Sequence, residues 1–102
     1  MKPFRVHRLA RREISEAFLH YQLTDDPTLA PDFRSKLRAA FREIRLNPAR
    51  YPRQHRTLVR KYILKRFPYL VFYIDYPECI RVFAIAHASR RPGYWKSRIT
   101  VA

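Results

Sequence analysis

The sequence predicts an α+β domain with the element order β-α-α-β-β-β, in which a helical hairpin packs on a four-stranded, mostly antiparallel sheet. Two amphipathic segments follow each other in the first half of the chain, and two apolar runs at residues 69–74 and 80–86 fill the second half. A chain of 102 residues can bury one modest core. We therefore expect residues 1–102 to form a single domain rather than two.

The first half of the chain predicts a strand, a helix and a turn. Residues 3–8 alternate between apolar and polar side chains, as in a half-buried strand. Within residues 10–21 the apolar side chains recur at helical spacing, which predicts a first helix. Residues 24–27 are expected to form a turn, because Asp side chains accept hydrogen bonds from the first turn of a helix and proline fits there.

A second helix should follow this turn. We expect it to begin between Thr28 and Asp32, with Pro31 in its first turn, since proline has no N–H to donate farther along. It should end at Asn47, because the residue before a proline is pushed out of helical geometry. Its apolar face comprises Phe33, Leu37, Ala40, Phe41 and Ile44. The two helices form a hairpin whose apolar face needs a cover.

The second half predicts three strands and a sharp turn. Residues 48–56 contain two prolines and three arginines without periodicity, and we interpret them as an irregular basic loop. Residues 57–64 are expected to form a strand that leads into the central strand 69–74. Because the central strand is apolar on both faces, helices should cover one face and loops or a partner the other. The only glycine, Gly93, follows Pro92, a pair that suits a type II turn.

Positive charge is concentrated in the half that contains the strands. The chain carries 22 Lys and Arg against 8 Asp and Glu, a net charge of +14. Residues 1–43 hold nine basic and six acidic side chains, a net +3, whereas residues 44–102 hold thirteen and two, a net +11. Such a surface is typical of a protein that meets nucleic acid, an acidic protein or both. The simpler interpretation is a solvated face.

Residue counts disfavour several classes of protein. The only cysteine, Cys79, excludes an intramolecular disulfide, so a reducing cytoplasm is the expected compartment. The histidines lack metal-ligand spacing, and we expect neither a metal nor a cofactor. No apolar run is long enough to span a bilayer, and the first residues lack the apolar core of a secretory signal peptide.

Three motifs in the second half resemble those of a known family. They are FPYLVFY at residues 67–73, IRVFAIAH ending in His87, and RRPGYW at residues 90–95. With the order of elements, they resemble the RelE/ParE superfamily of bacterial type II toxin–antitoxin toxins, also called plasmid stabilisation proteins. The resemblance implies a cytoplasmic bacterial toxin that a cognate antitoxin neutralises in a hetero-oligomer. It also implies contact with promoter DNA only through the antitoxin, and none with a membrane.

The superfamily contains two activities, and the resemblance alone does not decide between them. RelE-like members are metal-independent endoribonucleases that cleave mRNA on the ribosome, whereas ParE-like members bind and inhibit DNA gyrase. RelE-like enzymes carry an arginine on the strand where this sequence has Leu70. Leu70 and the tail after His87 favour gyrase inhibition, with ribosome-dependent mRNA cleavage as the alternative. A non-toxic basic domain that binds nucleic acid is a further alternative.

Candidate site residues gather where the last strand ends. Metal-free RNA cleavage needs a base, cations that stabilise the extra charge on the phosphate, and an acid for the leaving oxygen. The candidates for these catalytic roles, if the chain is a nuclease, are His87, Arg91, Tyr94 and Arg66. The candidates for binding nucleic acid or a partner protein are Arg60, Lys61, Lys65, Arg90 and Trp95.

Each candidate also has a structural interpretation. His87 could cap backbone groups at the end of its strand. Tyr94 and Trp95 either stack on a base or pin the C-terminal segment to the core. The cations near residues 60–66 could reach the surface beside Leu70 from the neighbouring strand and replace the missing arginine.

Overall fold

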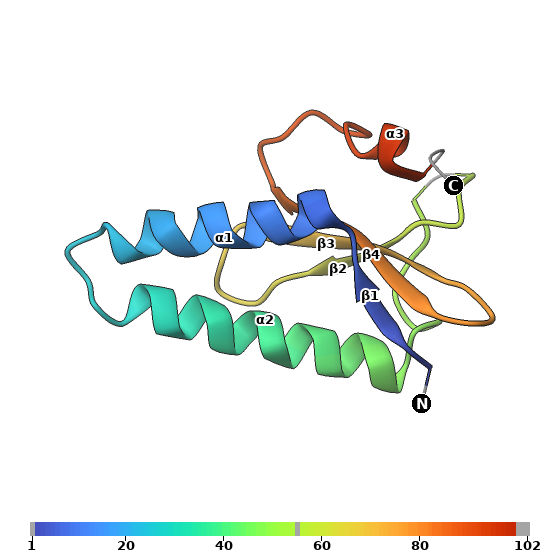
Figure 1. The fold of residues 1–102 in the computed structure, drawn as a ribbon, viewed down its shortest axis with the longest axis horizontal. Coiled ribbons are helices and arrows are strands. Elements are labelled where there is room, and N and C mark those ends of the chain that lie inside the picture. The colour runs from blue at the N-terminus through green and yellow to red at the C-terminus, as the bar shows by residue number, and fades with distance from the viewer. Residues whose placement is uncertain (1, 55, 100–102) are drawn as a thin grey trace.

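The described part of the chain folds into two long helices, one short helix and one four-stranded sheet (Figure 1). The computed structural model describes residues 2–54 and 56–99. The elements in order are β1 (Phe4–Val6), α1 (Arg8–Gln22), α2 (Leu29–Leu46), β2 (Arg60–Ile63), β3 (Tyr69–Asp75), β4 (Ile80–His87) and α3 (Lys96–Ile99). The predicted fold class and the predicted order of the first six elements are confirmed. The short α3 is an element that the sequence did not predict.

The strands lie in the order β1-β4-β3-β2. The β2–β3 and β3–β4 pairs are antiparallel, whereas β1 runs parallel to β4, with Phe4 opposite Ile80. The sheet is therefore mostly antiparallel, as predicted. The first strand takes the edge beside β4, a position that the sequence left open.

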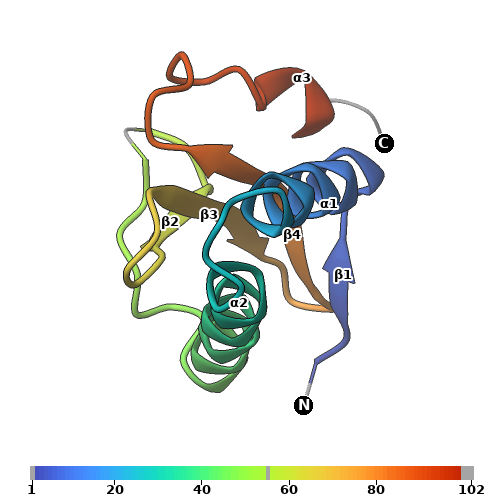
Figure 2. The same ribbon diagram turned by 90° about the vertical axis from the view of Figure 1, so that its left-hand side faces the viewer.

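Two apolar cores lie on opposite faces of the sheet. In Figure 2, α2 lies below the sheet and α3 lies above it. Side chains alternate along β3, so Val71 and Tyr73 pack beneath the helices, whereas Phe72 and Ile74 face the C-terminal tail, residues 88–99. The central strand is thus covered on both faces, as predicted, and the second cover is the tail of the chain itself.

The helical hairpin packs through the apolar faces that the sequence predicts. Fully buried residues of these faces are Ala10 of α1 and Phe33, Ala40 and Ile44 of α2. Phe33 makes edge contacts with Phe67, their ring centres 5.4 Å apart. This core fixes the face of the sheet that the helices occupy, and so leaves the other face for the tail.

A bulge in β4 changes which side chains face the tail. Phe72 pairs with Ala84, but the next residue of β3, Tyr73, pairs with Val82, so Phe83 has no partner across the ladder. As a result both Phe83 and Ala84 face the core under the tail. The extra residue widens the apolar surface on which the tail packs.

The first turn of α1 begins two residues before the predicted position. The helix starts at Arg8 rather than Ala10, and β1 is correspondingly shorter than residues 3–8. His7 causes the early start, because its Nδ1 atom accepts a hydrogen bond from the backbone N–H of Leu9 at 3.1 Å. A histidine in this role caps the helix as Asn or Asp commonly does.

We expect this cap to make stability depend on pH. Burial, then the positive charge of Arg81, lowers the pKa of His7 below its usual value of 6.5. A protonated Nδ1 cannot accept from Leu9, so the contribution of the cap is present above the usual pKa and is lost as the pH falls through the lowered one. His7→Asn keeps an acceptor that does not titrate. Thermal unfolding measured at about pH 7.5 and about pH 5 should therefore show that acidification lowers the stability of His7→Asn less than that of the unchanged chain. Equal losses would contradict the assignment.

The strand predicted over residues 57–64 is shorter than expected and begins at Arg60. The Thr57 hydroxyl donates to the carbonyl of Gln54 at 2.7 Å and accepts from the N–H of Val59 at 3.1 Å. The N–H of Gln54 in turn donates to the carbonyl of Val59 at 2.7 Å. The threonine hydroxyl competes with the sheet for these backbone groups, so residues 57–59 turn before the strand starts.

Candidate basic hollow

A hollow of about 260 Å³ lies on the tail side of the sheet. It is lined by Gln54, Lys61, Leu70, Phe72, Ala86, His87, Ala88, Arg90, Arg91, Pro92, Tyr94 and Trp95. We call it the basic hollow, because Lys61, Arg90 and Arg91 are cationic, His87 is an imidazole, and none of the lining side chains is acidic. The structure therefore brings together six of the nine site residues that the sequence predicts.

The register of the sheet explains why Lys61 reaches the basic hollow. Lys61 pairs with Phe72 across β2 and β3, so both side chains lie on the tail face. The floor consists of Leu70, Phe72 and Ala86, while Arg90 and Arg91 are exposed at the rim. An apolar floor with a cationic rim can hold an apolar side chain that is flanked by carboxylates or phosphates.

His87 is bound within its own turn at the end of β4. Its Nδ1 atom accepts from the backbone N–H of Ser89 at 3.1 Å and lies 2.7 Å from the Ser89 hydroxyl oxygen. Since Nδ1 is an acceptor, a neutral His87 ring carries its proton on Nε2. In this neutral form Nε2 is a donor and cannot take a proton from a substrate. The strand-end cap anticipated for this histidine is present.

Tyr94 is tied to α1 by its hydroxyl. It donates to Oε2 of Glu13 at 2.6 Å. Burial, then the hydrogen bond to Glu13, raises the pKa of Tyr94 well above its usual value of 10. The Arg90 guanidinium carbon lies 3.9 Å from the centre of the Tyr94 ring. The hydroxyl is thus occupied, and the ring supports a cation at the rim of the basic hollow.

The tail reaches this position through the predicted turn. The N–H of Tyr94 donates to the carbonyl of Arg91 at 3.3 Å across Pro92 and Gly93. Gly93 has a φ of 78°, which the third position of a type II turn requires and which only glycine adopts readily. The type II turn is confirmed. It directs Trp95 into the core, where its ring centre lies 5.1 Å from that of Phe72.

Three predicted site residues lie away from the basic hollow. Arg60 donates to the carbonyl of Tyr51 at 2.7 Å, and Lys65 lies 3.7 Å from Glu43 of α2. Arg66, in the turn between β2 and β3, forms an ion pair with Asp32 of α2. The hydrogen bond that Arg66 donates to the Asp32 carboxylate holds the pKa of Asp32 below its usual value.

These three cations therefore do not replace the arginine that RelE-like enzymes carry at the position of Leu70. Arg60 lies opposite Tyr73, on the helix face of the sheet, because its register differs by one residue from that of Lys61.

The family of the chain follows from comparison with known proteins. The model for the ParE toxin of the type II toxin–antitoxin system parDE matches residues 4–92. The chain belongs to the ParE toxin family. It is the toxin component of a type II toxin–antitoxin system, and its partner is a cognate antitoxin. The RelE/ParE resemblance is thereby confirmed, with the match on its ParE side.

A solved structure supports the fold of this ParE toxin. It is described as the chromosomal ParDE TA system from P. aeruginosa, and it is similar to this chain with a TM-score of 0.73. The identity is 17%, and the match covers 85% of this chain and 96% of the other. No curated protein matches the sequence. At this identity the structural match shows the shared fold alone.

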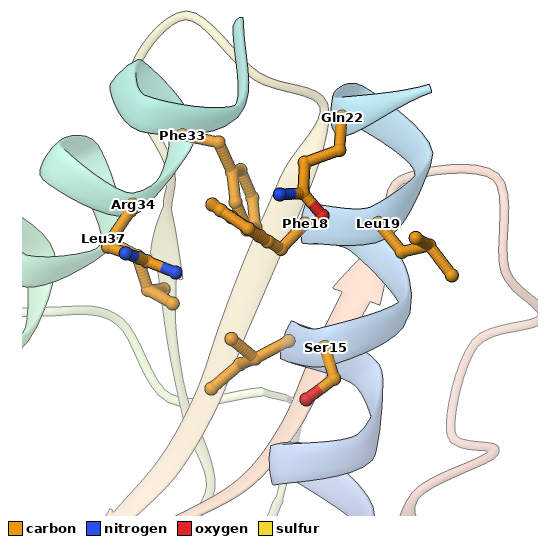
Figure 3. A pocket seen from close by; sticks show the side chains of 8 residues that line it. Ser15, Phe18, Leu19, Gln22, Phe33, Arg34 and Leu37 are labelled. Atoms are coloured by element: carbon orange, nitrogen blue, oxygen red, sulfur yellow. The ribbon is translucent and has the colours of Figure 1, made fainter. Parts of the chain in front are cut away.

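A second depression of this ParE toxin lies between the two long helices (Figure 3). It has a volume of about 200 Å³ and is lined by Ile14, Ser15, Phe18, Leu19, Gln22, Phe33, Arg34 and Leu37. Phe18 and Phe33 point toward each other across it, and the Arg34 guanidinium carbon lies 4.2 Å from the centre of the Phe18 ring. Sequence reasoning did not identify this apolar groove, because it assigned the apolar faces of both long helices to the core.

Sequence reasoning also missed two residues that hold the tail. Glu13 of α1 and Arg98 of α3 form an ion pair at 2.8 Å, with side chains only 13% and 10% exposed. The sequence did contain a signal for Glu13. It lies three residues after Ala10 and four before Ala17, so it borders the apolar stripe of its helix rather than the solvent face. Arg98 offered no comparable signal, because α3 itself was not predicted.

Within residues 2–54 and 56–99, no three His, Cys, Asp or Glu side chains lie together as a metal site. In the same part of the chain, no helix has the length and apolar character needed to cross a membrane.

Proposed function

We propose that this toxin stops growth by binding DNA gyrase and that the basic hollow is the surface that meets the enzyme. The observation that carries this proposal is the floor of the hollow. Leu70, Phe72 and Ala86 can neither transfer a proton nor stabilise charge on a phosphate. They can bury an apolar side chain of a protein segment, while the rim pairs with carboxylates around it. Gyrase acts on DNA, so this target places the toxin in the bacterial cytoplasm.

The two groups best suited to move protons support the same proposal. The Nδ1 atom of His87 is occupied by Ser89, and the hydroxyl of Tyr94 is occupied by Glu13. Both would have to leave these partners before they could act as base or acid on RNA. A surface that recognises a protein needs no such rearrangement, because its contacts are made by the exposed rim.

Ribosome-dependent mRNA cleavage is the alternative, and one observation favours it. Lys61, His87, Arg90 and Arg91 surround the same hollow, and such a cluster can also bind phosphates. This alternative predicts that His87→Ala abolishes mRNA cleavage in a translating extract while the fold is retained.

A supercoiling assay with purified gyrase tests the proposal. The unchanged toxin should inhibit supercoiling, and Arg38→Ala on the exposed face of α2 should inhibit equally, since it leaves the basic hollow intact. No inhibition at excess toxin would reject gyrase as the target. Binding to bare DNA with a steep dependence on salt, without inhibition, would indicate a nucleic-acid-binding domain instead.

We also propose that the antitoxin covers the basic hollow with an acidic segment. The net charge of +14 favours an acidic partner, and a segment seated on the rim would exclude gyrase. Antitoxin added to the supercoiling assay should therefore restore the activity of gyrase, because antitoxin and gyrase compete for the same surface of the toxin. Formation of a ternary complex would contradict this placement.

A further inference from the structure

Glu13 joins three parts of the chain through one carboxylate. Its Oε1 atom accepts from the N–H of Ile85 in β4 at 3.0 Å and from Nη1 of Arg98 at 2.8 Å. Its Oε2 atom accepts from Nη2 of Arg98 at 3.1 Å and from the hydroxyl of Tyr94 at 2.6 Å. An ionised carboxylate has about four acceptor sites, and all of them are used here. Glu13 is therefore fully occupied within the protein.

The sheet explains why a carboxylate is needed at this place. β1 ends at Val6, and the N–H of His7 makes the last hydrogen bond to β4, at Val82. Beyond that point, no strand within residues 2–54 and 56–99 pairs with the outer edge of β4. Glu13 accepts from Ile85, and Arg98 donates to the carbonyl of Phe83 at 2.9 Å. The ion pair thus supplies the hydrogen bonds that a longer β1 would have made.

The same carboxylate is connected to the rim of the basic hollow. The hydroxyl of Tyr94 is held by Glu13, and the Tyr94 ring lies beneath the guanidinium of Arg90. When an arginine stacks on an aromatic ring, the position of the ring determines where the guanidinium lies. Arg90 is exposed and follows β4 in a loop, and its guanidinium carbon lies 3.9 Å from the centre of the Tyr94 ring, so the ring can hold this side chain in place.

We infer that Glu13 is a positioning residue for target recognition, which fixes the Tyr94 ring and thereby holds Arg90 at the rim of the basic hollow. This inference rests on the proposed function, since it assigns Arg90 to the surface that meets gyrase. Glu13 contacts no target itself, because its acceptor sites are filled.

Nuclear magnetic resonance tests the positioning without any target. A side chain stacked on Tyr94 has its proton signals shifted upfield by the ring, and we expect this for Arg90. In Glu13→Gln one amide oxygen cannot serve Ile85, Arg98 and Tyr94 together. The upfield shift should be largely lost, and amide exchange at Tyr94 should rise about tenfold. The same chemical change at exposed Glu78, in the β3–β4 turn, is the control and should alter neither signal.

A second variant protects the test against loss of the fold. Tyr94→Phe retains the ring and removes only the hydroxyl that donates to Glu13. It should also lose most of the Arg90 shift. An unchanged shift in either folded variant would overturn the inference, because the ring would then be held by other contacts.

Gyrase affinity tests the consequence for recognition. Glu13→Gln should lower affinity about as much as Arg90→Ala, and the double variant should be no weaker than Arg90→Ala alone, since both changes remove one interaction. Additive losses would mean that Glu13 acts only through general stability, and would overturn the inference. If the unchanged toxin does not bind gyrase, the proposed function fails, and the resonance experiment alone decides whether Glu13 positions Arg90.

Discussion

Reversing the charge of both rim arginines is expected to weaken gyrase inhibition by at least about 100-fold. Each charged hydrogen bond contributes about 1.5–3 kcal/mol, and about 1.4 kcal/mol corresponds to a factor of ten in affinity. Arg90→Glu with Arg91→Glu removes two such contacts and adds repulsion of an acidic target segment. Both side chains are exposed, so the fold should be retained. The toxin concentration for half-inhibition of supercoiling measures the effect.

A matched double variant separates recognition from net charge. Arg38→Glu with Arg42→Glu makes the same change in charge on the exposed face of α2, away from the basic hollow. Recognition at the rim predicts inhibition close to that of the unchanged toxin for this control. Equal losses in the two double variants would show that overall charge, rather than the hollow, attracts the target.

Truncation of Trp95 is expected to produce the largest loss of stability among the tail residues. Its side chain is 4% exposed and packs on Phe72 in the core under the tail. A buried aromatic side chain replaced by alanine typically costs about 3–5 kcal/mol, and the whole domain is stable by only about 5–15 kcal/mol. Trp95→Ala should therefore lower the urea midpoint strongly and release the rim of the basic hollow.

Two comparisons show whether this loss arises from packing. Trp95→Phe retains an aromatic ring and should lose clearly less stability than Trp95→Ala. Leu23→Ala truncates a side chain that is 77% exposed and should change stability by less than about 0.5 kcal/mol. A loss in Trp95→Ala as small as that in Leu23→Ala would mean that the tail is not part of the core.

The elements with strong periodicity could be predicted from the sequence. The apolar face of α2, from Phe33 to Ile44, repeats at helical spacing over three turns, and β3 and β4 are apolar runs bounded by a proline turn. The sequence did not predict α3, because four residues carry no period. The cap formed by His7 and the turn formed by Thr57 depend on single hydrogen bonds, which composition does not indicate.

The site could be predicted where its residues are contiguous and not where it depends on register. His87 ends one apolar run and Arg90 and Arg91 follow it within four residues, so their proximity was evident. Lys61 and Arg60 are neighbours in sequence but point to opposite faces, and only the pairing of β2 with β3 decides which one faces the hollow. Glu13 lies more than 70 residues before Ile85, and only the folded chain brings them together.

The most direct test of the gyrase proposal is to induce this chain alone in a bacterial host and to follow translation and chromosome supercoiling in the same culture. Gyrase inhibition through the basic hollow predicts altered supercoiling and a DNA-damage response while translation continues at first, with both effects absent in the Arg90→Glu, Arg91→Glu variant. Early arrest of translation with fragmented mRNA, before any change in supercoiling, would contradict the account and assign the same surface to RNA cleavage.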